Sequence, residues 1–334
     1  MGRGPTVAYH KEMIEGYVTG TLTCLSAAYL KKRVSADFPL VLNIEPTNAC
    51  NLNCYLCPRT KAPRKVGYMD FSLYERIISE CAAHKKLKMI NFHKDGEPLI
   101  HPRIFEMIRF AARKDVAEVL HLNTNGLFLD EPSSREFLGS GIDDVTVSVD
   151  ASRRETFKKI KGADLLEKVE ENVERLFRLK RELRLERPFI RVKIMEYEDT
   201  RGPEIKEFIS RWKGIADDVQ VTGVHNWSGA IDGLKVTDEV REKRYPCVLL
   251  WYMLAVNWDG RVSACNVDWD LSAAVGDLKE KTLGEIWNGT QIKRLRKAEL
   301  AGRHDSAGVC RDCVVWAGGE DMTDWLGQKK EFYT

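Results

Sequence analysis

The chain has 334 residues, of which 43% are hydrophobic, and this length and composition favour one large domain with a smaller one. Its 52 Lys and Arg residues against 50 Asp and Glu residues leave a net charge of +2, which argues against nucleic acid as the main partner. We find no apolar run of 18 or more residues and no charged-then-apolar leader, so we expect no membrane span and no signal peptide. Nine cysteines, grouped in metal-ligand spacings, favour a cytoplasmic protein with metal clusters over a disulfide-bonded secreted protein.

The residue pattern divides the chain into three parts. Residues 1–38 are expected to form a helical extension, because apolar residues recur at helical spacing over residues 10–33. Residues 39–235 are expected to form a domain of alternating strands and helices. Residues 236–334 are expected to form a small C-terminal domain that contains a β-hairpin.

Six strands alternate with helices in the central part. Strands are predicted at 40–45, 88–92, 118–122, 145–149, 190–195 and 219–224. A capping box of Ser72 and Glu75 is predicted to start one helix, Pro102 is predicted to open the next, and a further helix is predicted to follow Pro203. The alternation implies an α/β fold with a parallel sheet, either open and doubly wound or a partial barrel. In both, ligands bind at the carboxyl ends of the strands.

Three cysteines, Cys50, Cys54 and Cys57, lie within eight residues directly after the first predicted strand. Three thiolates from one loop can hold three corners of a [4Fe–4S] cluster, which leaves one iron open for a ligand that is not protein. A zinc knuckle or three buried cysteines is the alternative interpretation.

This Cys-x3-Cys-x2-Cys pattern after a strand resembles the radical S-adenosylmethionine (radical SAM) superfamily. The resemblance implies a partial (β/α)6 barrel in which the open iron binds SAM, whose cleavage yields a 5′-deoxyadenosyl radical that abstracts a hydrogen atom from substrate. The family usually has an aromatic residue before the last cysteine. Here Leu56 takes that place and Tyr55 precedes it, and we expect both to line the cofactor site.

Motifs at later strand ends resemble SAM-binding segments of the same family. After the second strand, the family's Gly-Gly-Glu-Pro motif has its counterpart in Asp95-Gly96-Glu97-Pro98, and after the third strand Asn123 and Asn125 belong to an Asn-Thr-Asn-Gly segment. Ser148 and Asp150 share one side of the fourth strand, where they either face the SAM ribose or cap the next helix.

Two further residues are candidates for catalysis. Lys193 lies with Arg191 on one face of the fifth strand, where a buried cation needs an anionic partner such as the SAM carboxylate. We assign Lys193 to the cleft and leave Arg191 open. His225, at the end of the sixth strand, is a candidate base because its charge changes near neutral pH, although a histidine at a strand end is as often structural.

A second set of four cysteines lies in the C-terminal part. Cys247 and Cys265 flank a predicted hairpin with a turn at Asp259-Gly260, and Cys310 and Cys313 form a Cys-x2-Cys knuckle. Four thiolates saturate either a zinc ion or a cluster, and spacing does not separate the two. The arrangement resembles the Twitch domain, a shortened SPASM domain, and this resemblance implies one auxiliary [4Fe–4S] cluster.

The combined resemblance predicts a radical SAM oxidoreductase of antibiotic biosynthesis. The cysteine spacings are similar to those of aminoglycoside dehydrogenases and epimerases, so we expect a small-molecule substrate, an aminocyclitol or sugar whose secondary alcohol is oxidised with the auxiliary cluster as electron acceptor. Flavodoxin or ferredoxin is the expected reductant. Epimerisation of a sugar or peptide, maturation of a ribosomal peptide, and a non-catalytic iron–sulfur or zinc protein remain as alternatives.

Overall fold

A computed structural model describes residues 25–224, 226–231 and 242–333. A nine-stranded sheet organises these residues, with the strand order β6-β5-β4-β3-β2-β1-β7-β8-β9. Strands β1 to β6 pair in parallel in chain order, and β7 adds to the other edge of β1. The sheet is open, so the predicted α/β partial-barrel class is confirmed. The strands are β1 (Val41–Ile44), β2 (Leu87–Asn91), β3 (Ala117–Thr124), β4 (Asp144–Ser148), β5 (Phe189–Glu196), β6 (Asp218–Gly223), β7 (Met253–Val256), β8 (Arg261–Ser263) and β9 (Ala274–Asp277).

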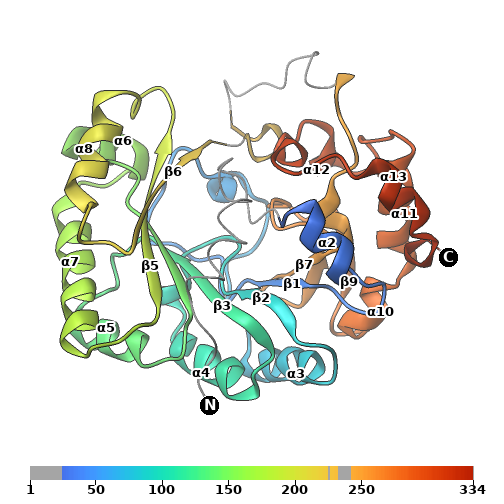
Figure 1. Ribbon diagram of the computed structural model, residues 1–334, viewed down its shortest axis with the longest axis horizontal. Helices are drawn as coiled ribbons and strands as arrows, with labels where there is room; N and C mark the ends of the chain where they lie inside the picture. The colour runs from blue at the N-terminus through green and yellow to red at the C-terminus, as the bar shows by residue number, and fades with distance from the viewer. Residues whose placement is uncertain (1–24, 225, 232–241, 334) are drawn as a thin grey trace.

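Helices follow each of the first five strands and cover one face of the sheet (Figure 1). We call this the outer face and the opposite one the inner face. The helices of the barrel are α3 (Phe71–Ala82), α4 (Ile104–Lys114), α5 (Glu131–Leu138), α6 (Arg154–Lys161), α7 (Leu166–Glu182) and α8 (Pro203–Trp212). This order is what right-handed crossovers between parallel strands require.

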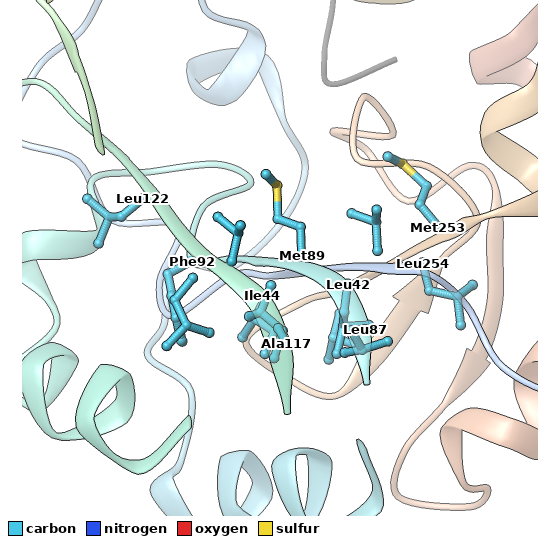
Figure 2. Packing of buried hydrophobic residues seen from close by; sticks show 14 of the residues in the cluster. Leu42, Ile44, Leu87, Met89, Phe92, Ala117, Leu122, Met253 and Leu254 are labelled. Carbon is cyan, nitrogen blue, oxygen red and sulfur yellow. The ribbon is translucent and has the colours of Figure 1, made fainter. Parts of the chain in front are cut away.

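Alternate residues of each strand point to opposite faces, and the two faces differ in chemistry. On β1, Leu42 and Ile44 point toward the helices, whereas Met89 and Met253 lie on the inner side (Figure 2). Asn43 lies between the two outward residues and accepts a hydrogen bond from Asn91 Nδ2 at 3.0 Å. The outer face is thus an apolar core, and the inner face carries polar side chains.

Two predicted helix starts are wrong in detail. The cap of α3 is Asp70, whose carboxylate accepts the Ser72 N–H at 2.8 Å, so the Ser72–Glu75 capping box does not form. Aspartate is at least as good an N-cap as serine and reaches the free amides first. Pro102 lies in the turn before α4 instead of opening it, whereas the helix predicted to follow Pro203 is α8, which includes Pro203 as its first residue.

The predicted hairpin is formed by β7 and β8, with Gly260 at φ +93° in the turn. It extends the barrel sheet, because β7 pairs in parallel with β1 along all four residues of that strand. The small C-terminal part is therefore joined to the barrel through continuous backbone hydrogen bonds. The predicted boundary after residue 235 lies outside the described residues and stays a prediction.

Short helices complete the C-terminal part: α10 (Leu283–Trp287), α11 (Thr290–Leu300), α12 (Gly308–Arg311) and α13 (Thr323–Gln328). The N-terminal helix α2 (Ala27–Arg33) lies against this region, because Glu320 Oε1 accepts the Ala27 N–H at 2.7 Å. Single 3-10 turns are η1 (Pro58–Lys61), η2 (Pro98–Ile100), η3 (Trp227–Gly229), η4 (Val248–Trp251), η5 (Val315–Gly318) and η6 (Lys330–Phe332). Within the described ranges, none of the helices is long and apolar enough to cross a membrane.

Candidate active site

The first three predicted metal ligands lie together in the loop that follows β1. Cys50, Cys54 and Cys57 are half-buried free thiols, and Cys54 interacts electrostatically with each of the other two. Burial raises the pKa of all three thiols, that of Cys57 to about 12. A positive centre such as iron is needed to hold such groups as thiolates. This donor set fits a cluster with three protein ligands.

The turn after β2 packs directly against the backbone at the start of the cysteine loop. Gly96 has φ +85°, and a Cβ placed there would lie 2.6 Å from the carbonyl oxygens of Thr47 and Ala49, just before Cys50. The Glu97 N–H donates to the Ala49 carbonyl at 2.8 Å. Only glycine allows the two backbone segments to lie this close, so contact with the cysteine loop requires a glycine at position 96.

The Glu97 carboxylate also joins β2 to β3. It accepts hydrogen bonds from Thr124 Oγ1 at 2.8 Å and from the N–H groups of Asn125 at 2.7 Å and Leu99 at 3.1 Å. Asn125 Nδ2 in turn donates to Asn51 Oδ1 at 2.8 Å, within the cysteine loop. Burial raises the pKa of Glu97 to about 7.

Asp95 belongs to a buried network of charges. Arg64 donates to Asp95 at 2.9 Å and also to Glu45, and Lys94 Nζ donates to Asp95 at 2.7 Å. Lys94 Nζ also donates a hydrogen bond to the Asp268 carbonyl oxygen at 2.9 Å, and Asp268 lies in the loop that follows Cys265. The network thus connects the end of β1 with the second cysteine set, and Arg64, Glu45 and Lys94 were missed in the sequence.

The end of β4 meets the cysteine loop through a lysine that the sequence analysis also missed. Lys161, the last residue of α6, donates to Asp150 Oδ2 at 2.6 Å and to the Ser148 carbonyl at 2.9 Å. Its charge also interacts with Cys54 and Cys50. Asp150 Oδ1 is buried without a partner in the described structure, so it remains available to a ligand hydroxyl.

The two cations of β5 have different surroundings. Arg191 is buried and paired with Asp144 at 2.7 Å, and Asp144 also contacts His121 Nδ1 at 2.6 Å. Arg191 is therefore structural, which resolves the open assignment. Lys193 is half-buried on the same face, and among the described residues it has no hydrogen bond or ion pair. Burial lowers its pKa.

The four cysteines of the second set interact with one another in the structure, and their role as metal ligands stays a prediction. Cys247, Cys265, Cys310 and Cys313 are free thiols that interact electrostatically with one another, and burial raises the pKa of each. Arg244 Nη1 donates to the Cys310 carbonyl at 2.7 Å.

In the parts of the chain that the structure describes, no group of three or more His, Cys, Asp or Glu side chains is found that could hold a metal ion.

The remaining predicted residues surround the first cysteine loop. Leu56 is buried, and Tyr55 is 45% exposed with its hydroxyl 3.3 Å from Asp199. Pro98 is buried in the Glu97 turn, and Asn123 is half-buried on β3. Their predicted roles toward SAM stay predictions, and His225 lies outside the described residues.

Two protein-family models match this chain. The model described as "Radical SAM superfamily" matches residues 44–185, and the SPASM model, described as "Iron-sulfur cluster-binding domain", matches residues 247–314. The chain contains a radical SAM domain and a SPASM domain. These domains imply SAM and an auxiliary [4Fe–4S] cluster. That Cys50, Cys54 and Cys57 hold the SAM-binding cluster, and the C-terminal cysteines the auxiliary one, stays a prediction.

The known proteins that are similar to this chain differ in how much of it they match. The tungsten-containing aldehyde ferredoxin oxidoreductase cofactor-modifying protein of Pyrococcus furiosus is 28% identical over 170 residues, which cover 50% of this chain and 47% of that protein. The chain thus aligns with about half the length of that relative. The SAM-dependent 2-deoxy-scyllo-inosamine dehydrogenase of Niallia circulans is 20% identical over 278 residues, covering 82% of this chain and 92% of that protein.

Two solved structures share the fold. The complex of BtrN with AdoMet and 2-DOIA has a TM-score of 0.57 at 18% identity, covering 83% of this chain and 93% of that one. SuiB of Streptococcus suis bound to the precursor peptide SuiA has a TM-score of 0.64 at 15% identity, covering 92% of this chain and 77% of that one.

Proposed function

We propose that this radical SAM enzyme oxidises a secondary alcohol of an aminocyclitol or sugar to a ketone, in the biosynthesis of an antibiotic or related natural product. The observation that carries the proposal is the second set of four converging thiols, connected to the barrel through Lys94. Four protein ligands saturate a cluster, which suits electron transfer and leaves no open iron for substrate. The sequence similarity to 2-deoxy-scyllo-inosamine dehydrogenase, which extends over 92% of the length of that protein, supports alcohol oxidation as the reaction.

The bound cofactors would supply radical formation from SAM, hydrogen-atom abstraction and an acceptor for one electron. The residues of this chain position them. The Glu97 turn holds the cysteine loop through Ala49, and Asn125 ties the same loop to β3. Lys161 fixes Asp150 so that its free oxygen Oδ1 is available to a ribose hydroxyl.

The alternatives receive less support from the described residues. Radical epimerisation needs a hydrogen donor, usually a thiol, yet Cys81 is buried in the apolar core at 1% exposure and burial raises its pKa. Cys24 lies outside the described residues. Peptide maturation is the alternative that fits the likeness to SuiB, which was solved with a precursor peptide. It becomes the expected reaction if no cyclitol or sugar reacts.

An external reductant of the flavodoxin or ferredoxin class is part of the proposal, because SAM cleavage consumes an electron from outside the protein. We also place the protein in the cytoplasm. The eight cysteines in the described residues are all free, as a reducing compartment would keep them.

The test is anaerobic turnover of the iron-loaded enzyme with dithionite, SAM and a panel of cyclitols that includes 2-deoxy-scyllo-inosamine. Mass spectrometry would follow 5′-deoxyadenosine and ketone, and we expect equal amounts of both. Cys310→Ala/Cys313→Ala is the control variant, in which SAM cleavage persists and ketone is lost. Cleavage of SAM without ketone from any cyclitol or sugar would refute the oxidation, and no cleavage at all would refute every enzymatic interpretation.

A further inference from the structure

One loop of the C-terminal part, residues 265–273, is attached to the barrel at two distant points. Lys94 Nζ, just beyond β2, donates a hydrogen bond to the Asp268 carbonyl at 2.9 Å. Trp269 Nε1 donates to the Trp227 carbonyl at 3.1 Å, in the segment that follows β6. Three other strands separate β2 from β6 in the sheet. The loop therefore connects two sides of the barrel at the carboxyl ends of its strands.

Asp268 also holds the shape of this loop and its contact with the cysteine knuckle. Its carboxylate accepts hydrogen bonds from the Ala273 N–H at 3.1 Å and from Ser272 Oγ at 3.3 Å. Ser272 Oγ in turn accepts the Val309 N–H at 3.1 Å, and Val309 directly precedes Cys310. A continuous series of hydrogen bonds thus leads from the barrel to the segment that carries two of the four cysteines.

Lys94 is completely enclosed at the start of this series. Its side chain is 0% exposed, and those of Asp95, Arg64 and Glu45, which form the ion-pair network with it, are 4%, 3% and 0% exposed. The two cations and two carboxylates balance in charge. A buried ammonium is stable only while it is paired and hydrogen-bonded. Because the Asp268 carbonyl is one of its acceptors, the contact with the loop is part of what allows Lys94 to be buried.

We infer that Lys94 is a positioning residue that holds the loop of residues 265–273, and with it the second cysteine set, against the turn of residues 95–98. The inference rests on the proposed oxidation, in which the electron left on the substrate passes to the auxiliary cluster. That transfer requires the second cysteine set to keep a constant position relative to the barrel, and Lys94 supplies the contact on the β2 side. Lys94 itself contacts no reacting atom and transfers neither a proton nor an electron.

The first experiment measures amide hydrogen exchange in the iron-loaded Lys94→Met variant, whose side chain keeps an apolar stem and lacks the ammonium. The amides of Ala273 and Val309 report on the loop, because both are held in the hydrogen-bond series through Asp268. We expect both to exchange about 10- to 100-fold faster than in wild type, the factor for losing a hydrogen bond from a charged donor. Unchanged exchange at both amides would overturn the inference.

Lys88→Met is the matched control for this measurement. Lys88 lies near the start of β2, its side chain is 4% exposed, and its ammonium is 2.9 Å from Glu118. The control therefore removes a buried, ion-paired cation from the strand that leads to Lys94. We expect the amides of Ala273 and Val309 to exchange as in wild type. Equal acceleration in both lysine variants would show general loosening of the protein and would also refute a specific role for Lys94.

A second variant separates the contact with the loop from the balance of charge. Lys94→Met leaves two carboxylates, Asp95 and Glu45, with Arg64 alone, whereas Lys94→Met/Asp95→Asn restores the balance. We expect the double variant to regain thermal stability and still to show fast exchange at the two amides, because the Asp268 carbonyl has lost its donor. This variant also replaces the single one if that does not fold. Wild-type exchange in the double variant would reduce Lys94 to a charge partner and contradict the positioning role.

The consequence for the reaction is measured as ketone formed per 5′-deoxyadenosine with 2-deoxy-scyllo-inosamine. We expect this ratio to fall about 10-fold or more in Lys94→Met, because small displacements of reacting groups have effects of this size, and to match wild type in Lys88→Met. An unchanged ratio in Lys94→Met would overturn the inference. If wild type forms no ketone, the proposed oxidation fails, whereas the exchange of the two amides still shows whether Lys94 holds the loop. The two failures are therefore distinguishable.

Discussion

Replacing Lys161 by methionine should destabilise this protein strongly, whereas the same change two residues earlier should not. Lys161 and Lys159 are both on α6, and each has its ammonium 2.6 Å from an aspartate. They differ in burial. The side chains of Lys161 and Asp150 are 5% and 3% exposed, against 61% and 27% for Lys159 and Asp199. Lys159→Met is therefore a matched control.

The expected magnitude follows from the burial. Removing one partner of a buried ion pair costs about 3–5 kcal/mol, because the other charge stays buried without compensation. An exposed pair contributes about 0–1 kcal/mol. With an unfolding entropy of roughly 2.1 cal/mol/K per residue, a chain of this length loses about 1.4 °C per kcal/mol. Lys161→Met should thus lower the thermal midpoint by about 4–7 °C, and Lys159→Met by about 1 °C or less.

The assay is anaerobic thermal unfolding of the iron-loaded proteins, extended to a double-mutant cycle with Asp150→Asn. The double variant Lys161→Met/Asp150→Asn should recover much of the loss, because asparagine leaves no buried charge. Equal midpoints for the two lysine variants, or a double variant less stable than Lys161→Met alone, would refute the reasoning from burial.

Two further predictions concern the cofactors and the Glu97 turn. Reconstituted wild type should contain about eight iron atoms per chain, and the Cys310→Ala/Cys313→Ala variant about four, as measured by iron and acid-labile sulfide content. About four iron atoms in both proteins, with zinc in the wild type, would make the C-terminal site structural. Because burial raises the pKa of Glu97 from 4.5 to about 7, the folded state retains a proton that the unfolded state releases between these values. The free energy of unfolding should therefore fall as pH rises through this range, and Glu97→Gln should flatten that fall in urea titrations at pH 5 and pH 8; an unchanged slope would contradict the assignment.

Local sequence determined the features whose residues are close together in the chain. The spacing of Cys50, Cys54 and Cys57 brings three thiols into one loop whatever surrounds it. The alternation of strands and helices implies the parallel sheet, because crossovers between parallel strands are right-handed and short. The turn at Gly260 similarly defines the hairpin on its own.

Only the tertiary structure decided which charged side chains are paired. Arg191 and Lys193 share one strand face and look alike in the sequence, yet Arg191 meets Asp144 of the neighbouring strand and Lys193 does not. Register and strand order create that difference. The same holds for Lys161, which reaches the cysteine loop from more than 100 residues away, and for β7, which extends the barrel sheet beside β1. Sequence patterns specify local geometry, whereas contacts between distant residues depend on how complete elements pack.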